Sequence, residues 1–261
     1  MAYIVVCSVT FILSILSLFS GFGLGSVLMP AFALFFPLQL AIAATAVVHL
    51  ANNIFKVLLV GKNADWVTVV RFGIPAAISA MVGAALLTFL DKIPVLMSYS
   101  ISSGTYEITV LKLSIGVIIV GFALFEISPF ADKLEFDKKY MPLGGIISGF
   151  FGGLSGNQGA LRSAFLIKSG LSKEAFIGTG TVATVIVDIC RILVYGFSIY
   201  TTKLNTLSNE IWHLVIAATV VSFIGTFTAN RLVKKIKFRT IQLIVCVMLI
   251  TVGSAISLGI F

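Results

Sequence analysis

Long runs of apolar residues recur along this chain, and they limit its fold more than any other feature. Each run approaches the about 20 residues that a helix needs to cross a bilayer core of ~30 Å. Barrel strands alternate apolar and polar residues over ~10 positions, whereas these runs are continuously apolar for longer. We therefore predict an all-α fold, a polytopic membrane helix bundle with about eight transmembrane segments. The expected segments are residues 3–20, 39–60, 71–90, 109–127, 141–168, 173–199, 211–232 and 241–260.

The composition favours lipid over water as the solvent of this chain. Only 11% of the 261 residues are charged and 59% are hydrophobic, whereas a soluble domain carries ~25% charged residues. The formal net charge of +8 lies mainly between the apolar runs, so we assign it to lipid headgroups and orientation and not to nucleic acid. Residues 1–20 have no basic n-region, and the apolar stretch continues past Gly25. We expect a retained first helix and not a cleaved signal peptide.

A polar linker near the middle of the chain suggests an internal repeat. Residues 128–140 mix charges of both signs, and we predict a first repeat over 1–127 and a second over 141–261. Each half contains a glycine-rich stretch, at 21–25 and at 152–159. Because each glycine weakens a helix by ~1 kcal/mol relative to alanine, both segments are predicted to be broken or re-entrant helices. The sequence leaves open whether the halves are parallel or inverted.

Broken membrane helices in corresponding positions of two halves indicate a transport site. Their unpaired backbone groups cannot face lipid, so they line a cavity or lie within protein. The second half-helices would begin at Ser26 and Ala160, where free N–H groups and partial positive charge attract anions. Gly25, Asn157 and Gln158 lie beside these ends. We expect these residues to contribute to an anion site.

Some of the glycines have a packing role instead. Gly145, Gly149 and Gly153 follow the small-xxx-small spacing that lets membrane helices approach closely. We expect the early members of this series to pack helices. From Gly152 onward, the glycines are expected to break the segment.

Two stripes of polar residues occupy equivalent places in the two halves. Their members recur at spacings of three and four, so each stripe lies on one helix face. Such faces turn away from lipid, toward a partner helix or a water-filled path. The first stripe is Thr45, His49, Asn52 or Asn53, and Lys56; the second is Thr181, Thr184, Asp188 and Arg191.

The charged members of this region have alternative interpretations. Asp188 and Arg191 are three residues apart, so they either neutralise each other or let Arg191 hold an anion that Asp188 tunes. Arg162 has no acidic residue near it in the sequence, and it is either a substrate contact or a membrane-edge anchor. Lys56 either faces the site or snorkels to the surface. His49 is either a proton carrier or a hydrogen-bond partner for a neighbouring helix.

No motif in the sequence indicates catalysis. HExxH, GxSxG and P-loop patterns are all missing, and Cys7, Cys190 and Cys246 lie in apolar runs without metal-ligand spacing. We predict that the chain is not an enzyme and has neither a cofactor nor a metal site. The candidate substrate-binding residues are Gly25, Ser26, Thr45, His49, Asn53, Lys56, Asn157, Gln158, Arg162, Thr181, Asp188 and Arg191.

The two glycine stretches, each with the Ala- and Thr-containing start of the following helix, resemble the TauE/SafE (TSUP) family of sulfite exporter-like membrane permeases. The family pattern departs in the second half, where Ala164 stands in place of a proline and the glycine run is diluted. The resemblance implies a secondary transporter for a small anion, a sulfur-containing oxyanion or organosulfonate such as sulfite or sulfoacetate. A membrane channel and a non-transporting accessory subunit are the alternatives. The residues that carry the resemblance are GFGLGSVLMP (21–30) with AIAAT (41–45), and GLSGNQGALRSAF (153–165) with AFIGTGT (175–181).

Charge placement gives an orientation. With eight crossings, the positive-inside rule puts the basic cluster before the last helix in the cytoplasm and the 128–140 linker outside, although the lysines of that linker conflict with this. Glu107 and Glu126 lie near helix ends and are expected in water. We expect an integral protein of the bacterial inner membrane with a small anion and lipids as partners; a coupling ion and a homo-oligomer stay open. The basic cluster is Arg231, Lys234, Lys235, Lys237 and Arg239.

Overall fold

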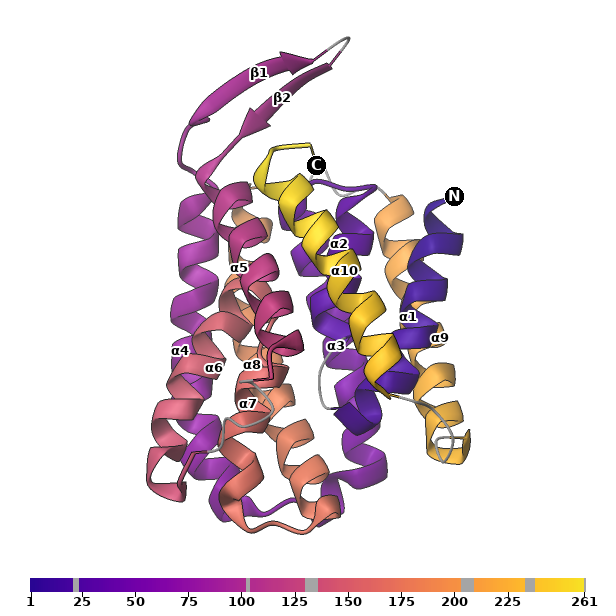
Figure 1. Cartoon of the computed structure of the whole chain (residues 1–261), viewed down its shortest axis with the longest axis vertical. Coiled ribbons are helices and arrows are strands. Elements are labelled where there is room, and N and C mark those ends of the chain that lie inside the picture. Colours follow the sequence, from indigo (N-terminus) through magenta and orange to yellow (C-terminus); the bar gives the residue numbers. More distant parts are fainter. Residues whose placement is uncertain (21–23, 102–103, 130–135, 203–208, 233–237, 261) are drawn as a thin grey trace.

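The computed structural model of the chain describes residues 1–20, 24–101, 104–129, 136–202, 209–232 and 238–260. Within these residues the chain forms a bundle of ten α-helices, capped at one end by a β-hairpin (Figure 1). The helices are α1 (Ala2–Ser20), α2 (Leu24–Ala33), α3 (Leu38–Val60), α4 (Trp66–Leu90), α5 (Val110–Ile127), α6 (Met141–Ser155), α7 (Gly159–Leu166), α8 (Lys173–Thr202), α9 (Asn209–Leu232) and α10 (Phe238–Ser257). The remaining elements are the 3-10 turns η1 (Gly61–Asn63), η3 (Lys138–Tyr140) and η4 (Ile167–Ser169), with strands β1 (Met97–Ile101) and β2 (Gly104–Ile108).

The structure confirms the helical membrane bundle. Among the described residues, five helical stretches are long and apolar enough to cross a bilayer, and α1 and α10 contain shorter apolar stretches. The count of eight crossings, the two repeats and the orientation remain predictions, and the lysines of the basic cluster lie outside the described residues. The five stretches are Leu38–Asn63, Trp66–Leu90, Val110–Ile127, Lys173–Phe197 and Glu210–Ala229.

Helix α4 shows how such a bundle meets lipid. One of its faces, with Phe72 and Ala76, is buried, whereas Val70, Ile74 and Ile78 on the opposite face are each more than half exposed. A soluble helix would put polar residues on that outer face. An apolar outer face of this length suits the hydrocarbon core of a membrane.

Helices α4 and α6 approach backbone to backbone. A Cβ atom added at Gly145, Gly149 or Gly153 would lie only 2.0–2.3 Å from a carbonyl oxygen of α4. Side chains cannot occupy that space, so these glycines are required for the contact. The packing role predicted for the early members of this series is confirmed, whereas Gly153, which was expected to break the helix, packs against α4 as well. We call this contact the glycine seam.

The segment predicted over 141–168 is broken, as expected, although not at Gly152. Helix α6 continues through Gly152 and Gly153 and ends at Gly156, whose φ of +81° is left-handed. A left-handed residue after the last turn is a common helix terminator, and glycine adopts it without strain. Helix α7 starts at Gly159, so the expected start at Ala160 is wrong by one residue.

The first glycine stretch is described only in part. Residues 21–23, between α1 and α2, lie outside the described residues. Helix α2 starts at Leu24, so the backbone of Gly25 and Ser26 is already helical. The expected start at Ser26 is therefore two residues late.

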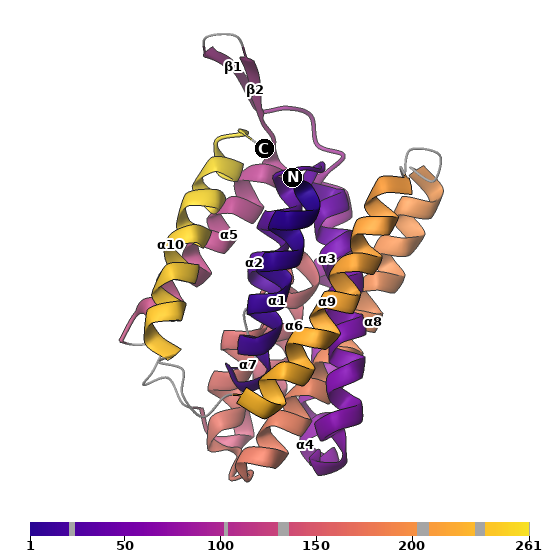
Figure 2. The same ribbon diagram turned by 90° about the vertical axis from the view of Figure 1, so that its right-hand side faces the viewer.

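The remaining helices complete the bundle around α3. Helix α1 packs against α9, and α5 packs against α10 (Figure 2). Helix α3 contacts α2, α8 and α9 and lies inside the bundle. Its polar stripe is thereby shielded from lipid on several sides.

The β-hairpin was not predicted, and the all-α assignment is wrong at this point. Strands β1 and β2 pair antiparallel, with Tyr99 opposite Tyr106 and their rings 5.5 Å apart. Aromatic and β-branched residues favour strands, and the Tyr99 hydroxyl donates to the Leu258 carbonyl at 2.6 Å. This bond fastens the hairpin to the end of α10.

Candidate functional site

The two predicted polar stripes face each other across the α3–α8 contact. Asp188 of α8 is fully buried and accepts hydrogen bonds through Oδ2 from two residues of α3. His49 Nδ1 lies 2.7 Å from this oxygen, and Asn53 Nδ2 donates to it at 3.1 Å. Asn52 points elsewhere and accepts from the Thr226 hydroxyl of α9 at 2.7 Å. The stripe therefore runs through Asn53 and not through Asn52.

Arg191 is held at the same carboxylate from within α8. Its Nη2 atom lies 2.8 Å from Asp188 Oδ1, and the two side chains are 1% and 0% exposed. Its Nη1 atom donates to the Gly152 carbonyl of α6 at 3.3 Å. The structure thus shows an ion pair between Asp188 and Arg191 within α8. The bond from Arg191 to the Gly152 carbonyl also joins α8 to the end of α6.

The start of α2 and the end of α6 meet beside His49. A Cβ atom at Gly25 of α2 would lie 3.0 Å from the Gly156 carbonyl oxygen and 3.4 Å from His49 Nε2. A Cβ atom at Gly156 would lie 2.9 Å from Arg191 Nη1. A side chain at Gly25 would press on the Gly156 carbonyl, and the left-handed φ of +81° at Gly156 is one that glycine adopts without strain.

Lys56 points into the bundle. It is 4% exposed, and its ammonium group donates to the Ser17 hydroxyl of α1 at 2.8 Å. The alternative that it snorkels to the surface is wrong. Because the hydroxyl partner is neutral, the charge of Lys56 is not cancelled by this bond.

Arg162 also lies inside the bundle and not at the membrane edge. It is 5% exposed, and its guanidinium donates to the Thr184 hydroxyl of α8. The Thr184 hydroxyl also donates to the Gly180 carbonyl at 2.8 Å. A Cβ at Gly180 would lie 3.3 Å from Arg162 Nε, so the small residue makes room for the guanidinium.

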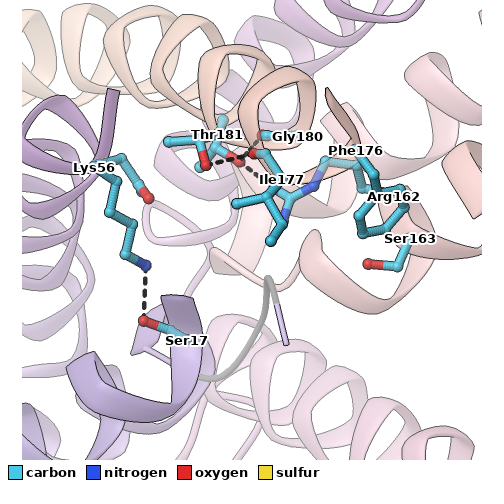
Figure 3. Close-up of a pocket in the computed structure, with 10 residues that line it drawn as sticks. Ser17, Lys56, Arg162, Ser163, Phe176, Ile177, Gly180 and Thr181 are labelled. Atoms are coloured by element: carbon cyan, nitrogen blue, oxygen red, sulfur yellow. Dashed lines mark hydrogen bonds between the residues drawn. The ribbon is translucent and has the colours of Figure 1, made fainter. Parts of the chain in front are cut away.

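A cavity lies between these two cations. Lys56 and Arg162 approach it from different sides (Figure 3), and Asn53 connects its wall to Asp188. Its free volume is about 20 Å³, the space of one or two water molecules. None of the described lining residues carries a carboxylate. They are Ser17, Asn53, Lys56, Arg162, Ser163, Phe176, Ile177, Gly180, Thr181 and Thr184.

The structure brings together only some of the predicted site residues. Asn53, Lys56, Arg162 and Thr181 line the cavity, and His49, Asp188 and Arg191 form the adjacent charged cluster. Gly25 lies against that cluster, whereas the side chain of Ser26 is outside the described part of the structure. The other predicted residues lie outside both the cavity lining and the charged cluster, and each has a buried side-chain atom without a hydrogen-bond partner in the described structure. They are Thr45, Asn157 and Gln158.

Several lining residues were missed from the sequence. Thr184 belonged to the predicted stripe and could have been selected from it. Ser17 comes from α1, and Phe176 and Ile177 come from the start of α8. Nothing local in the sequence distinguishes these three from ordinary helix residues, because their position depends on how distant helices pack.

The profile of the sulfite exporter TauE/SafE family matches residues 6–256. The chain belongs to this family. The match covers nearly the whole chain, so it confirms the resemblance and makes the protein an integral membrane protein of a transporter family. Comparison with curated proteins and with solved structures found no significant match.

Proposed function

We propose that the protein is a secondary transporter that binds a small sulfur-containing oxyanion or organosulfonate, such as sulfite or sulfoacetate, between Lys56 and Arg162. One observation carries this proposal. Two buried cations face a polar cavity that has no carboxylate among its described lining residues. We also place the protein in the bacterial inner membrane, where a carrier of this kind exchanges anions with the cytoplasm.

Buried cations of this kind favour an anionic ligand. Removing a charge from water costs several kcal/mol, and a hydroxyl group offsets only part of that cost. Ser17 and Thr184 are neutral partners, so an anion can replace them and accept stronger, charge-assisted hydrogen bonds. The Ser163 hydroxyl has no hydrogen-bond partner in the described structure and can donate to a further oxygen of the anion.

The balance of charge around the cavity indicates the charge of the ligand. Among the described residues around the cavity, Lys56, Arg162 and Arg191 supply three cations, and Asp188 supplies one carboxylate. With neutral His49, the net charge of these four residues is positive. Fully ionised sulfite and sulfoacetate are dianions, so either would bring the region close to neutrality.

The size of the cavity favours a carrier over an open channel. At about 20 Å³ it holds one or two water molecules, which is less than sulfite needs. The anion therefore requires movement of the surrounding side chains or helices before it binds. Carriers with a central site between broken helices work by such alternating movements.

The direct test is anion flux in proteoliposomes. We expect Lys56→Gln and Arg162→Gln each to reduce radiolabelled sulfite and sulfoacetate flux by roughly 10- to 100-fold, because a hydrogen bond to a charged group contributes ~1.5–3 kcal/mol. The matched controls are Lys92→Gln and Arg71→Gln, whose side chains are exposed. Normal flux in both cavity variants would remove the proposed site. Flux far above carrier turnover would instead favour the channel, and no flux of any anion in the wild type would favour the accessory subunit.

A further inference from the structure

His49 connects the charged cluster to the place where the start of α2 meets the end of α6. Its Nδ1 atom contacts Asp188 at 2.7 Å, and its side chain is 12% exposed where that of Asp188 is fully buried. The charged groups that act on His49 are Asp188 and Arg191 of α8 and Lys56 of α3. The charge of Asp188 in turn acts on Arg162 of α7 and on Tyr195 of α8. His49 is thus the more accessible member of a buried acid–imidazole pair.

The contacts of the imidazole ring define which nitrogen can take up a proton. The carboxylate of Asp188 favours the tautomer in which Nδ1 carries the hydrogen and donates it. Nε2 then holds the lone pair, with the Asn53 amide 3.4 Å away. It faces Gly25, where the absence of a side chain leaves space beside the ring. A proton added at Nε2 would convert the neutral pair into an imidazolium–carboxylate pair.

Proton uptake at His49 and anion binding in the cavity should assist each other. A proton on His49 raises the excess of positive charge around the cavity, and charges in a buried region interact far more strongly than in water. An anion between Lys56 and Arg162 offsets that excess. Asn53 belongs to both places, since it lines the cavity and donates to Asp188. By linkage, each ligand raises the affinity for the other by the same factor.

We propose that His49 is the coupling-proton site of this transporter and that a proton on its Nε2 atom travels with the anion. This inference rests on the proposed transport function and names the co-transported ion, which that function leaves open. The proton taken from water on one side forms an N–H bond at Nε2, and that bond breaks again when the proton is released to water on the other side.

Calorimetry of sulfoacetate binding tests the linkage directly. Sulfoacetate is a suitable probe because both of its acidic groups stay ionised between about pH 6 and pH 8. Titrations in two buffers with different ionisation enthalpies give the number of protons taken up. We expect uptake of up to one proton per anion, and a dissociation constant that falls by up to about tenfold for each unit decrease in pH.

Matched histidine variants assign the proton to its residue. His49→Gln keeps a hydrogen-bonding side chain but cannot be protonated, so we expect no proton uptake and a pH-independent dissociation constant. The control is His213→Gln, which removes an exposed histidine at the start of α9 and should retain the wild-type linkage. Binding without proton uptake in the wild type, or uptake that persists in His49→Gln, would overturn the inference.

A second measurement does not depend on the folding of the His49 variant. The chain has two histidines, so in His213→Gln protein with isotope-labelled histidine the ring nitrogen NMR signals report His49 alone. Sulfoacetate should shift the Nε2 signal toward the imidazolium position near neutral pH, and an unchanged signal would contradict the inference. Sulfoacetate flux in proteoliposomes without proton movement would overturn proton coupling and leave the transport function intact. Absence of any anion flux or binding would overturn both.

Discussion

Two helix contacts in this bundle use opposite means to bring helices together. The glycine seam joins α4 to α6 through bare backbone, with Gly149 so close to Ala76 that a Cβ would lie 2.1 Å from its carbonyl oxygen. The α3–α8 contact, which we call the polar seam, joins its helices through His49, Asn53 and Asp188. The first contains no charge, and the second contains a fully buried carboxylate.

The difference separates stability from function. In lipid, close packing of small residues stabilises helix pairs without any cost of desolvation. Buried charges are expensive in the same surroundings and are generally retained for binding or transport. We therefore expect the glycine seam to be sensitive to size and the polar seam to be sensitive to charge.

The largest expected effect is the loss of the Asp188 charge. Asp188→Asn leaves Arg191 buried without a counter-ion, and breaking a buried pair in this way costs ~3–5 kcal/mol. The measurement is the free energy of unfolding in mixed micelles. The double variant Asp188→Asn with Arg191→Met removes both charges and should recover much of the stability while anion flux stays low. A double variant no more stable than the single one would mean that packing, and not charge, dominates the polar seam.

The next effect concerns the glycine seam. Gly149→Ala places a methyl group against the Ala76 backbone, and overpacking of this kind typically costs ~1–3 kcal/mol. Gly121→Ala on α5 is the matched control, because a Cβ there meets no atom within 4 Å. Thermal unfolding should show a lower melting temperature for the first variant and an unchanged or slightly higher one for the second. Equal melting temperatures would show that the helices can separate at no cost.

The smallest expected effect concerns Asp65, which joins the α4–α6 pair to the α3–α8 pair. Asp65 caps the start of α4 by accepting from the Thr68 N–H at 2.7 Å, and its own N–H donates to the Thr179 hydroxyl of α8 at 2.9 Å. The bonds from Thr68 hold the pKa of the Asp65 carboxyl below its ordinary value. Loss of such a cap in Asp65→Ala typically costs ~1 kcal/mol.

The effect of Asp65 should depend on pH in a defined direction. Because its pKa is lowered in the folded protein, the charge stabilises the fold above the ordinary carboxyl pKa of about 3.9. That stabilisation is lost as the pH falls below this value and through the lowered pKa. The difference in melting temperature between wild type and Asp65→Ala should therefore shrink in acid. Asp65→Asn keeps a capping side chain without the charge, and its difference from Asp65→Ala should not vary with pH.

Much of the fold was predictable because apolar length and glycine placement act locally. The helix boundaries of α3, α5 and α8 lie close to the predicted ones, and the spacing of the two polar stripes identified the residues that meet at Asp188. Helical periodicity is sufficient for this, since it fixes which side chains share a face. Periodicity does not show which faces of different helices meet, so the place of Ser17 in the cavity wall could not be predicted from it.

Other features depended on competition between local and distant interactions. The break in the second half lies at Gly156 because glycines before it are held in the helix by packing against α4. Glu107 is exposed as expected, whereas Glu126, one residue before the end of α5, is only 9% exposed, and the expectation of a solvated carboxyl is wrong. Neighbouring helices cover it, and its sequence position near a helix end could not reveal them. The two strands of the hairpin are short and lie between two strong membrane segments, so their pattern did not predict them.

The contact between Gly25 and Gly156 has a mechanical consequence. A Cβ at Gly25 would lie 3.0 Å from the Gly156 carbonyl oxygen, so the two chain segments touch there without an intervening side chain. Two backbone segments in direct contact can rotate about the contact, but they cannot separate without leaving an empty gap. The contact is therefore suited to act as a pivot between α2 and the end of α6. Distances between pairs of attached labels should change least for pairs that flank this contact and most for pairs at the ends of the bundle.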